Sequence, residues 1–246
     1  MFDEPNQLAA ALRRVRDLSE ENERLNAQLK HAREKHAELE ARYLNLEEQS
    51  SLDPRTKEMG ILNPSGFEQR KREIQSLLDR ENDAIFAIFV IDVDGFKRVN
   101  DTLGHPVGDK VITSLAKTLR QSTRPTDMVT IARPGGDEFV IILKINSFDA
   151  DRIALRAETI NFRFRENCAG YIGNTPISLS FGLAIFNKQS EKIWKIIQTY
   201  SDDVSKTFVE EMEKLADLCL LEAKRRGKKR ICWKDFDGKF KERVFE

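Results

Sequence analysis

Residues 84–94 read AIFAIFVIDVD, and this stretch decides the fold. Its first eight residues are all apolar, which is typical of a strand that is buried on both faces of a sheet. We predict helices over residues 67–78, 108–121, 149–165 and 191–226, and further strands over 128–132, 138–143, 177–186 and 230–233. The resulting order, βαββαβαβ, predicts an α/β (α+β) domain in which helices flank a mixed five-stranded sheet.

Residues 6–52, which precede this domain, contain neither glycine nor proline, and their apolar residues repeat in heptads. The a positions are Leu8, Val15, Asn22, Leu29, His36 and Tyr43, and the d positions are Ala11, Leu18, Leu25, Ala32, Leu39 and Leu46. This pattern predicts a coiled-coil helix roughly 65 Å long. A lone asparagine at an a position favours a parallel dimer, so Asn22 predicts a homodimer. The alternative is a single amphipathic helix that packs on its own domain.

The domain organisation follows from where the heptads stop. The sequence SSLDP at residues 50–54 is typical of a helix end. We therefore predict a dimerisation stalk over residues 1–52, a globular domain over 53–233, and a C-terminal tail over 234–246 that carries no motif we can interpret.

The composition sets limits on partners and location. Lysine plus arginine and aspartate plus glutamate number 41 each, so the net charge gives no reason to expect a nucleic-acid partner. The longest apolar run is far shorter than the roughly 20 residues of a membrane span, and the first residues lack the apolar segment of a signal peptide. The three cysteines form no CxxC pair, which favours reduced thiols. We expect a cytoplasmic protein with no membrane span.

Two acidic loci lie where a sheet of this kind binds ligands. Asp92 and Asp94 end the buried strand, while Asp137 and Glu138 follow a Gly-Gly dipeptide that suits a tight hairpin turn. Carboxylates that are brought together require a cation, and magnesium with substrate phosphates is a common solution. Each of these acids alone is typical of a solvated surface, but the two loci together indicate a metal-dependent site.

Other polar residues suit a nucleotide. Asn100 and Asp109 offer an amide and a carboxylate, and a carboxylate accepts hydrogen bonds from guanine N1–H and N2–H₂, a donor pair that adenine lacks. Asp109 also has a simpler interpretation, as the cap of the helix predicted from residue 108. Residues 224–230, KRRGKKR, carry six positive charges, which suit either a triphosphate clamp or a solvated helix end favoured by the helix dipole. The sequence contains no P-loop motif.

Two segments carry a resemblance to a known family. Residues 133–139, RPGGDEF, and residues 92–109, DVDGFKRVNDTLGHPVGD, resemble the two signature segments of the GGDEF diguanylate cyclases. The resemblance covers about residues 53–233. It implies a nucleotidyl-cyclase-like palm fold and the condensation of two GTP molecules into cyclic di-GMP and two pyrophosphates. In that family two domains face each other, which gives the predicted dimeric stalk a purpose.

The resemblance also implies roles for single residues. Asp92, Asp137 and the carbonyl of Val93 are expected to hold Mg²⁺ or Mn²⁺, with Glu138 assisting metal binding or proton removal. The guanine base is expected to be read by two residues, Asn100 and Asp109. The remaining substrate contacts are expected from Phe96, Lys97, Gly135, Gly136, Lys224 and Lys228.

The sequence departs from the family at several positions. In the family's opening motif, DxLTGLxNR, Arg55 replaces the leucine and residues 57–59 are inserted. Pro134 stands at a position where an apolar or aromatic residue is usual, and Lys228 at a position where arginine is common. Lysine at position 228 keeps the positive charge of arginine but loses the bidentate geometry with which arginine binds a phosphate.

A product site is also implied. Arg124 and Asp127 match the RxxD of the family's inhibitory site for cyclic di-GMP, although Asp127 lies two positions further from Gly135 than usual. An even insertion preserves the facing of side chains in a strand. The alternative is an ordinary turn rich in proline and aspartate.

Three functions are compatible with these patterns. The first is an active cyclase, which the acidic pair and both guanine readers favour. The second is a non-catalytic GGDEF module that binds GTP or cyclic di-GMP as a signal, and the third is a coiled-coil scaffold with a vestigial domain. The sequence contains no recognisable sensor domain, so we expect the input signal to act on the stalk, for example through a regulatory protein.

Overall fold

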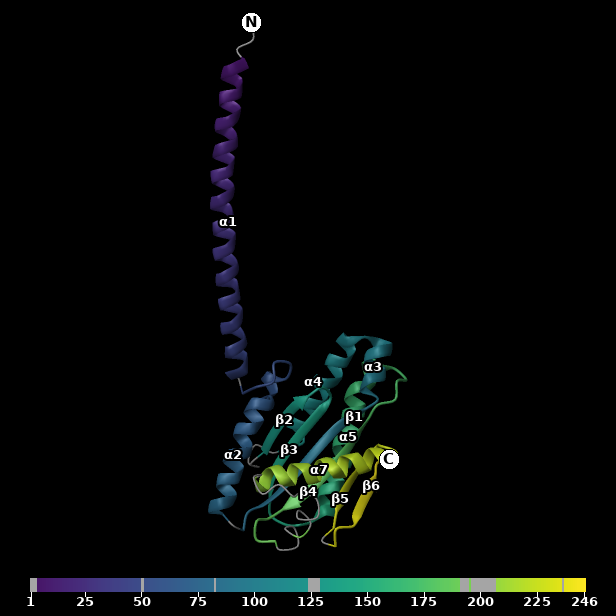
Figure 1. Cartoon of the computed structure of the whole chain (residues 1–246). Helices are drawn as coiled ribbons and strands as arrows, with labels where there is room; N and C mark the ends of the chain where they lie inside the picture. The colour runs from purple at the N-terminus through teal and green to yellow at the C-terminus, as the bar shows by residue number, and fades with distance from the viewer. Residues whose placement is uncertain are drawn as a thin grey trace. The chain divides into compact units, whose positions relative to one another are not determined.

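The structure is a computed structural model that describes residues 4–49, 51–81, 83–123, 129–190, 195, 207–235 and 237–246. It divides into two compact units, Met1–Gln49 and Ser50–Glu246 (Figure 1). The first unit contains one helix, α1 (Glu4–Gln49), of 46 residues, which corresponds to about 69 Å. At least half of the surface of Val15, Leu18, Leu25, Leu29 and Leu39 is exposed in the single chain. The coiled-coil dimer stays a prediction.

The second unit is built on one six-stranded sheet. Its strands are β1 (Ile85–Asp94), β2 (Val129–Gly135), β3 (Glu138–Ile145), β4 (Ser178–Phe186), β5 (Arg230–Lys234) and β6 (Phe240–Val244). They lie in the order β2-β3-β1-β4-β5-β6, and every neighbouring pair is antiparallel except β4 and β5. The predicted mixed sheet is confirmed. The predicted number of five strands is wrong, because part of the segment that we interpreted as a tail pairs with β5.

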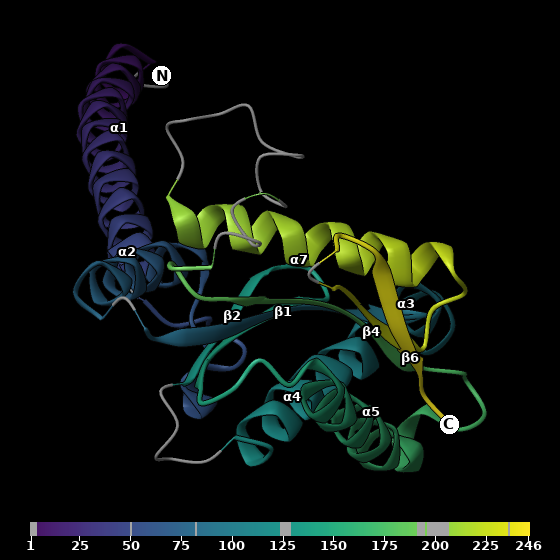
Figure 2. The ribbon, with the colours of Figure 1, turned by 90° about the horizontal axis from the view of Figure 1, so that it is seen from below.

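Helices cover both faces of this sheet. They are α2 (Pro64–Arg80), α3 (Phe96–Leu103), α4 (His105–Gln121), α5 (Ala150–Ile172) and α7 (Phe208–Arg225), with a short 3-10 helix, η1 (Lys57–Met59). Helices α2 and α7 pack on one face, while α4 and α5 pack on the other (Figure 2). The central strand β1 is therefore buried on both faces, which explains its unbroken apolar run. Among the described helices, none combines the length and the hydropathy that a membrane crossing requires.

Several predicted elements differ in their bounds from the observed ones, and one lies partly outside the described residues. Strand β1 continues through Asp94, and residues 96–103, for which we predicted no element, form α3. Helix α5 extends to Ile172, seven residues beyond its predicted end at residue 165. Of the helix predicted over 191–226, the structure describes α7, whereas 191–194 and 196–206 lie outside the described residues.

Helix α7 lies very close to the sheet, and this closeness positions the basic residues at its C-terminal end. A Cβ atom on Gly182 of β4 would lie 1.9 Å from the carbonyl oxygen of Ala216 on α7. A side chain at this position would displace the helix, and Lys224 in its last turn with it.

Candidate active site

The two acidic loci meet because of the strand register. Strands β1 and β3 are antiparallel and pair Asp92 with Glu138. The hairpin between β2 and β3 turns at Gly136, whose φ of 53° is in the left-handed region that favours glycine. This turn places Asp137 at the hairpin tip, beside Asp92. Both aspartates line a cavity of about 450 Å³.

The same cavity contains most of the residues that were predicted to contact phosphates or metal. Phe96 and Lys97, at the start of α3, line it together with Val93 and Lys228. Phe96 is half-buried against the core, whereas Lys97 is exposed. A Cβ atom on Gly135 or Gly136 would have no described neighbour within 4 Å, so the space beside the hairpin tip is open.

The acidic cluster, which we define as Asp92, Asp137, Glu138 and Lys224, is electrostatically coupled. Burial raises the pKa of Asp137, and the charge of Asp92 raises it further. Burial also raises the pKa of Glu138. Lys224 Nζ lies 2.7 Å from Asp92 Oδ2. Burial alone would lower the pKa of Lys224, but the hydrogen bond to Asp92 raises it overall. The ammonium group of Lys224 thus contacts Asp92 and also interacts electrostatically with Asp137 and Glu138.

A divalent cation fits this cluster. The described part of the chain contains no group of three or more His, Cys, Asp or Glu side chains that could hold a metal ion by themselves. Magnesium does not require such a group, because it is usually bound by one or two carboxylates together with substrate phosphates. Asp92 and Asp137 match that donor set, and the raised pKa of Asp137 indicates that its negative charge lacks full compensation.

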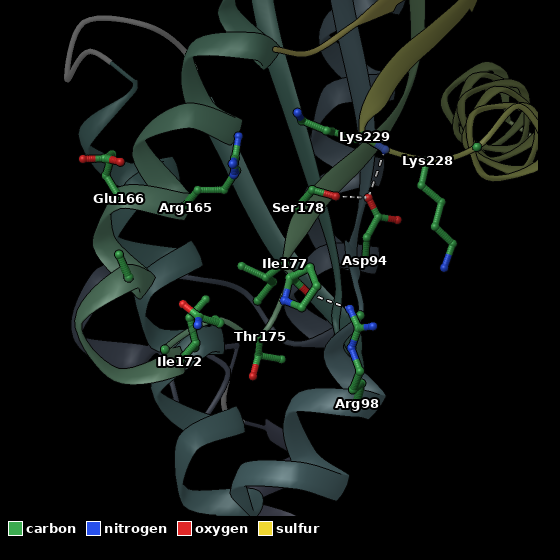
Figure 3. A pocket seen from close by; sticks show the side chains of 16 residues that line it. Asp94, Arg98, Arg165, Glu166, Ile172, Thr175, Ile177, Ser178, Lys228 and Lys229 are labelled. Carbon is green, nitrogen blue, oxygen red and sulfur yellow. Dashed lines mark hydrogen bonds between the residues drawn. The ribbon is translucent and has the colours of Figure 1, made fainter.

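Asp94 is not part of this cluster, although it belongs to the same sequence motif. Its side chain is buried and accepts hydrogen bonds from the hydroxyl groups of Ser178 and Ser180. It also accepts one from the backbone N–H of Lys229 (Figure 3). Both carboxylate oxygens are thus engaged inside the protein, so we do not count Asp94 among the residues expected to hold the metal.

Asn100 on α3 and Asp109 on α4, which we call the helical pair, come from two helices that pack against each other. A Cβ atom on Gly108 would lie 1.9 Å from Asn100 Oδ1, so the Asn100 amide rests on α4 next to Asp109. Helix α4 begins at His105 with Gly104 as its N-cap. Asp109 therefore lies inside the helix, and the interpretation of Asp109 as the helix cap is wrong.

Comparison with known proteins identifies the family. The profile of the family described as "Diguanylate cyclase, GGDEF domain" matches residues 53–230, which is more than half of the chain. This chain belongs to the GGDEF family. The probable diguanylate cyclase DgcT of Escherichia coli K12 is 35% identical over 150 residues, which cover 61% of this chain and 29% of that protein. This chain thus spans less than a third of that relative.

Solved GGDEF structures share the fold. The coiled coil and GGDEF domain of DgcB from Caulobacter crescentus, in complex with c-di-GMP, is 21% identical, with a TM-score of 0.56 over 84% of this chain and 97% of that one. The diguanylate cyclase SiaD from Pseudomonas aeruginosa, in complex with its activator SiaC, is 27% identical, with a TM-score of 0.51 over 91% of this chain and 79% of that one.

The first residues of the GGDEF domain fix the hairpin tip. Asp53 Oδ2 lies 2.8 Å from Arg133 Nη1, and both side chains are 8% exposed. Arg133 also donates hydrogen bonds from Nε and Nη2 to the carbonyl oxygen of Gly136. The inserted residues 57–59 form η1, which ends at Gly60 in a left-handed conformation. The insertion thus occupies one helical turn, and the Asp53–Arg133 pair is made in its presence.

Arg55 contacts the helical pair, a contact that sequence reasoning missed. Its Nη1 lies 3.2 Å from Asp109 Oδ1, and the two side chains are 56% and 55% exposed. The only signal in the sequence was that Arg55 replaces the usual leucine of the family. Arg124 and Asp127, the predicted product site, lie outside the described residues.

Proposed function

We propose that this chain is a diguanylate cyclase, which condenses two GTP molecules into cyclic di-GMP and releases two pyrophosphates. The observation that carries the proposal is the convergence of Asp92, Asp137 and Glu138 with Lys224 beside one cavity of a GGDEF-family domain. Carboxylates at a strand end, a nearby ammonium and an open glycine turn suit a triphosphate that carries a divalent cation.

Each domain would hold one GTP. The 3′-oxygen of one GTP forms a bond to the α-phosphorus of the other, and the bond from that phosphorus to the pyrophosphate oxygen breaks. Two such transfers close the ring. A bound Mg²⁺ or Mn²⁺ would neutralise the charge of the phosphates. Asp92 and Asp137 would hold that ion, with the Val93 carbonyl, and Lys224 and Lys228 would bind the phosphates.

Glu138 is our candidate to receive the 3′-hydroxyl proton. Burial raises the pKa of Glu138 in the direction of neutral pH. This favours a role as a general base, because a general base works best when its pKa lies near the pH of the reaction. The phosphates would compete with Asp92 for the ammonium group of Lys224. The ion pair with Asp92 therefore keeps Lys224 close to the proposed phosphate-binding position.

The helical pair would read the base. Asp109 accepts hydrogen bonds from guanine N1–H and N2–H₂, whereas adenine offers an acceptor to the same carboxylate. The Asp109 side chain is 55% exposed in the free chain, so the penalty applies once the bound base covers it. An acceptor that is buried without a partner costs about 1–3 kcal/mol, and more when it is charged. Asp109 therefore favours GTP over ATP by roughly tenfold to a hundredfold.

The reaction requires two domains, and the stalk would supply the dimer. The exposed a and d side chains of α1 support this proposal, because a stripe of this kind is buried in a coiled coil. Leu18→Pro together with Leu25→Pro should give monomers with little activity. Light scattering that still shows a dimer would count against the role of the stalk.

The stalk is also our candidate for the regulatory input. The related SiaD has been solved in complex with its activator SiaC, which supports a protein activator for this chain as well. We further propose that Arg124 and Asp127 bind cyclic di-GMP. Arg124→Ala should then relieve product inhibition with little change in the initial rate.

One experiment separates the cyclase from the other candidate functions. Pure protein is incubated with GTP and Mg²⁺, and the products are resolved by chromatography. The cyclase forms cyclic di-GMP and pyrophosphate. A chain that forms neither but binds labelled cyclic di-GMP or GTP would be a signalling module, and a chain that binds none of them would be a scaffold.

A further inference from the structure

The turn between α7 and β5 has an unusual backbone. Lys228 and Lys229 have φ values of 64° and 50°, and they are the two non-glycine residues with positive φ among the described residues. This region is disfavoured for side chains with a Cβ atom, and lysine is not among the residues that tolerate it best. Such strain persists only where the surrounding structure fixes it, and it gathers at functional sites.

Four hydrogen bonds fix this turn. The N–H of Lys228 donates to the Ala223 carbonyl at 3.0 Å, and Arg230 Nε donates to the Lys228 carbonyl at 2.9 Å. The N–H of Lys229 donates to Asp94 Oδ2 at 3.1 Å. The N–H of Phe245 donates to the Lys229 carbonyl at 3.0 Å. Every backbone donor and acceptor of the two lysines is thus engaged.

Two of these partners come from distant parts of the chain, and both are immobilised. Asp94, at the end of β1, is held by Ser178 and Ser180, as described above. Phe245, directly after β6, is 3% exposed, and its ring packs edge-on against Phe181 with the centroids 5.6 Å apart. The strained peptide of Lys229 therefore lies between two rigid anchors.

The side chain that this turn presents is Lys228, which lines the cavity with Asp92 and Asp137. Figure 3 shows the Lys228 side chain running alongside Asp94, on the wall of an adjoining cavity of about 720 Å³. No ion pair of Lys228 with an acidic residue occurs within the described ranges, so its ammonium group is open to an anionic ligand.

We propose that Asp94 and Phe245 are positioning residues, which hold the Lys228–Lys229 turn in its left-handed conformation and so place Lys228 against the substrate phosphates. This inference rests on the proposed function. Asp94, the second aspartate of the DVD motif, would then have a role distinct from metal binding. Phe245 would have a role in substrate affinity.

The test compares Asp94→Asn and Phe245→Ala with a matched control, Val244→Ala. Val244 precedes Phe245 but is 54% exposed. Loss of a hydrogen bond to a charged group predicts a KM for GTP that rises about tenfold in Asp94→Asn, with kcat changed much less, because the acidic cluster is untouched. Phe245→Ala should show the same split between KM and kcat, and Val244→Ala should match the wild type.

A second variant separates positioning from general damage to the fold. Asparagine tolerates the left-handed region better than lysine. Adding Lys229→Asn to Asp94→Asn should therefore recover part of the lost affinity for GTP. Thermal unfolding checks that each variant is folded, and calorimetric titration with a non-hydrolysable GTP analogue measures affinity independently of turnover.

The possible results are distinct. Wild-type KM and analogue affinity in Asp94→Asn or in Phe245→Ala would overturn the inference, as would a double variant with no recovery. Restoration of Asp94→Asn by excess Mg²⁺ would also overturn it, because that result assigns Asp94 to the metal. A wild-type chain that binds the analogue without turnover would refute the cyclase but leave the inference testable by affinity. A wild-type chain that binds no analogue would refute both.

Discussion

The acidic cluster and the helical pair both contain carboxylates that we assign to the substrate, but the fold buries them to different extents. Asp92 on β1 and Lys224 in the last turn of α7 are 14% and 32% exposed, and they form an ion pair. Asp109 and its partner Arg55 are more than half exposed. Charges interact more strongly where water is excluded. We therefore expect the chemistry to depend on the acidic cluster, which is partly buried at Asp92, Asp137 and Lys224, and the more exposed helical pair to set selectivity.

The largest effect should come from breaking the acidic cluster. Asp137→Ala removes half of the proposed metal site, so turnover should fall roughly a thousandfold or more. Steady-state kinetics at saturating GTP measure the loss, and light scattering and thermal unfolding confirm that the variant is a folded protein of unchanged oligomeric state. Turnover close to the wild type would show that Asp137 is not a metal ligand.

A smaller effect should follow from changing the helical pair. Asp109→Ser shortens the side chain and removes the charge that, in our proposal, rejects adenine. We expect the preference for GTP over ATP to fall by about tenfold to a hundredfold, and mixed GMP–AMP cyclic products to form from equal amounts of the two nucleotides. If wild-type protein already makes substantial mixed product, the assignment of Asp109 to guanine selection is wrong.

Removing the partner of Asp109 should have a milder effect. If Asp109 binds the base as we propose, Arg55 competes with guanine for the same carboxylate, so Arg55→Leu should lower the KM for GTP. Exposed ion pairs contribute about 0–1 kcal/mol, which corresponds to no more than about a fivefold change. Lys57→Gln, a matched change of charge in η1, is the control. A KM that rises in Arg55→Leu would mean that the arginine assists guanine binding instead.

The smallest effect is expected in the stability of the metal-free protein and in how that stability depends on pH. The pKa of Asp137 is raised in the folded state, so the folded chain binds more protons than the unfolded chain in the window above the usual carboxylate range. Stability should therefore fall as the pH rises through this window. Asp137→Asn should remove this contribution and raise the Tm of the metal-free protein at neutral pH by about 2 °C. Calorimetry that finds an unchanged or lower Tm would contradict the raised pKa.

Much of the fold could be predicted from local patterns. The central strand and the Gly-Gly hairpin were visible because a doubly covered strand must be apolar and a tight turn needs glycine. Helix α3 was missed because it is short and lies between Gly95 and Gly104, and glycine is a poor helix former. Strand β6 was missed because its sequence, FKERV, is mostly charged and exposed, so it lacks the alternation by which strands are recognised.

Which residues lie near the candidate site could be predicted from the sequence. The separate contacts that Asp92 and Asp94 make could not. Asp92 and Asp94 point to the same face of β1, because alternate residues of a strand do so. Strand β3 begins at Glu138, opposite Asp92, so Asp94 lies beyond the end of β3. Asp94 meets Ser178, Ser180 and the Lys229 turn instead. Contacts of this kind depend on where neighbouring strands end, which the sequence around Asp94 does not encode.

The proposed cyclase activity can be tested by measuring turnover and nucleotide binding on the same preparations of wild-type protein and Asp137→Asn. Both are incubated with GTP and Mg²⁺, and cyclic di-GMP and pyrophosphate are quantified. We expect the wild type to form one cyclic di-GMP for every two pyrophosphates, and Asp137→Asn to form almost none although it remains folded. A wild-type chain that binds GTP but forms no cyclic di-GMP would contradict the central claim.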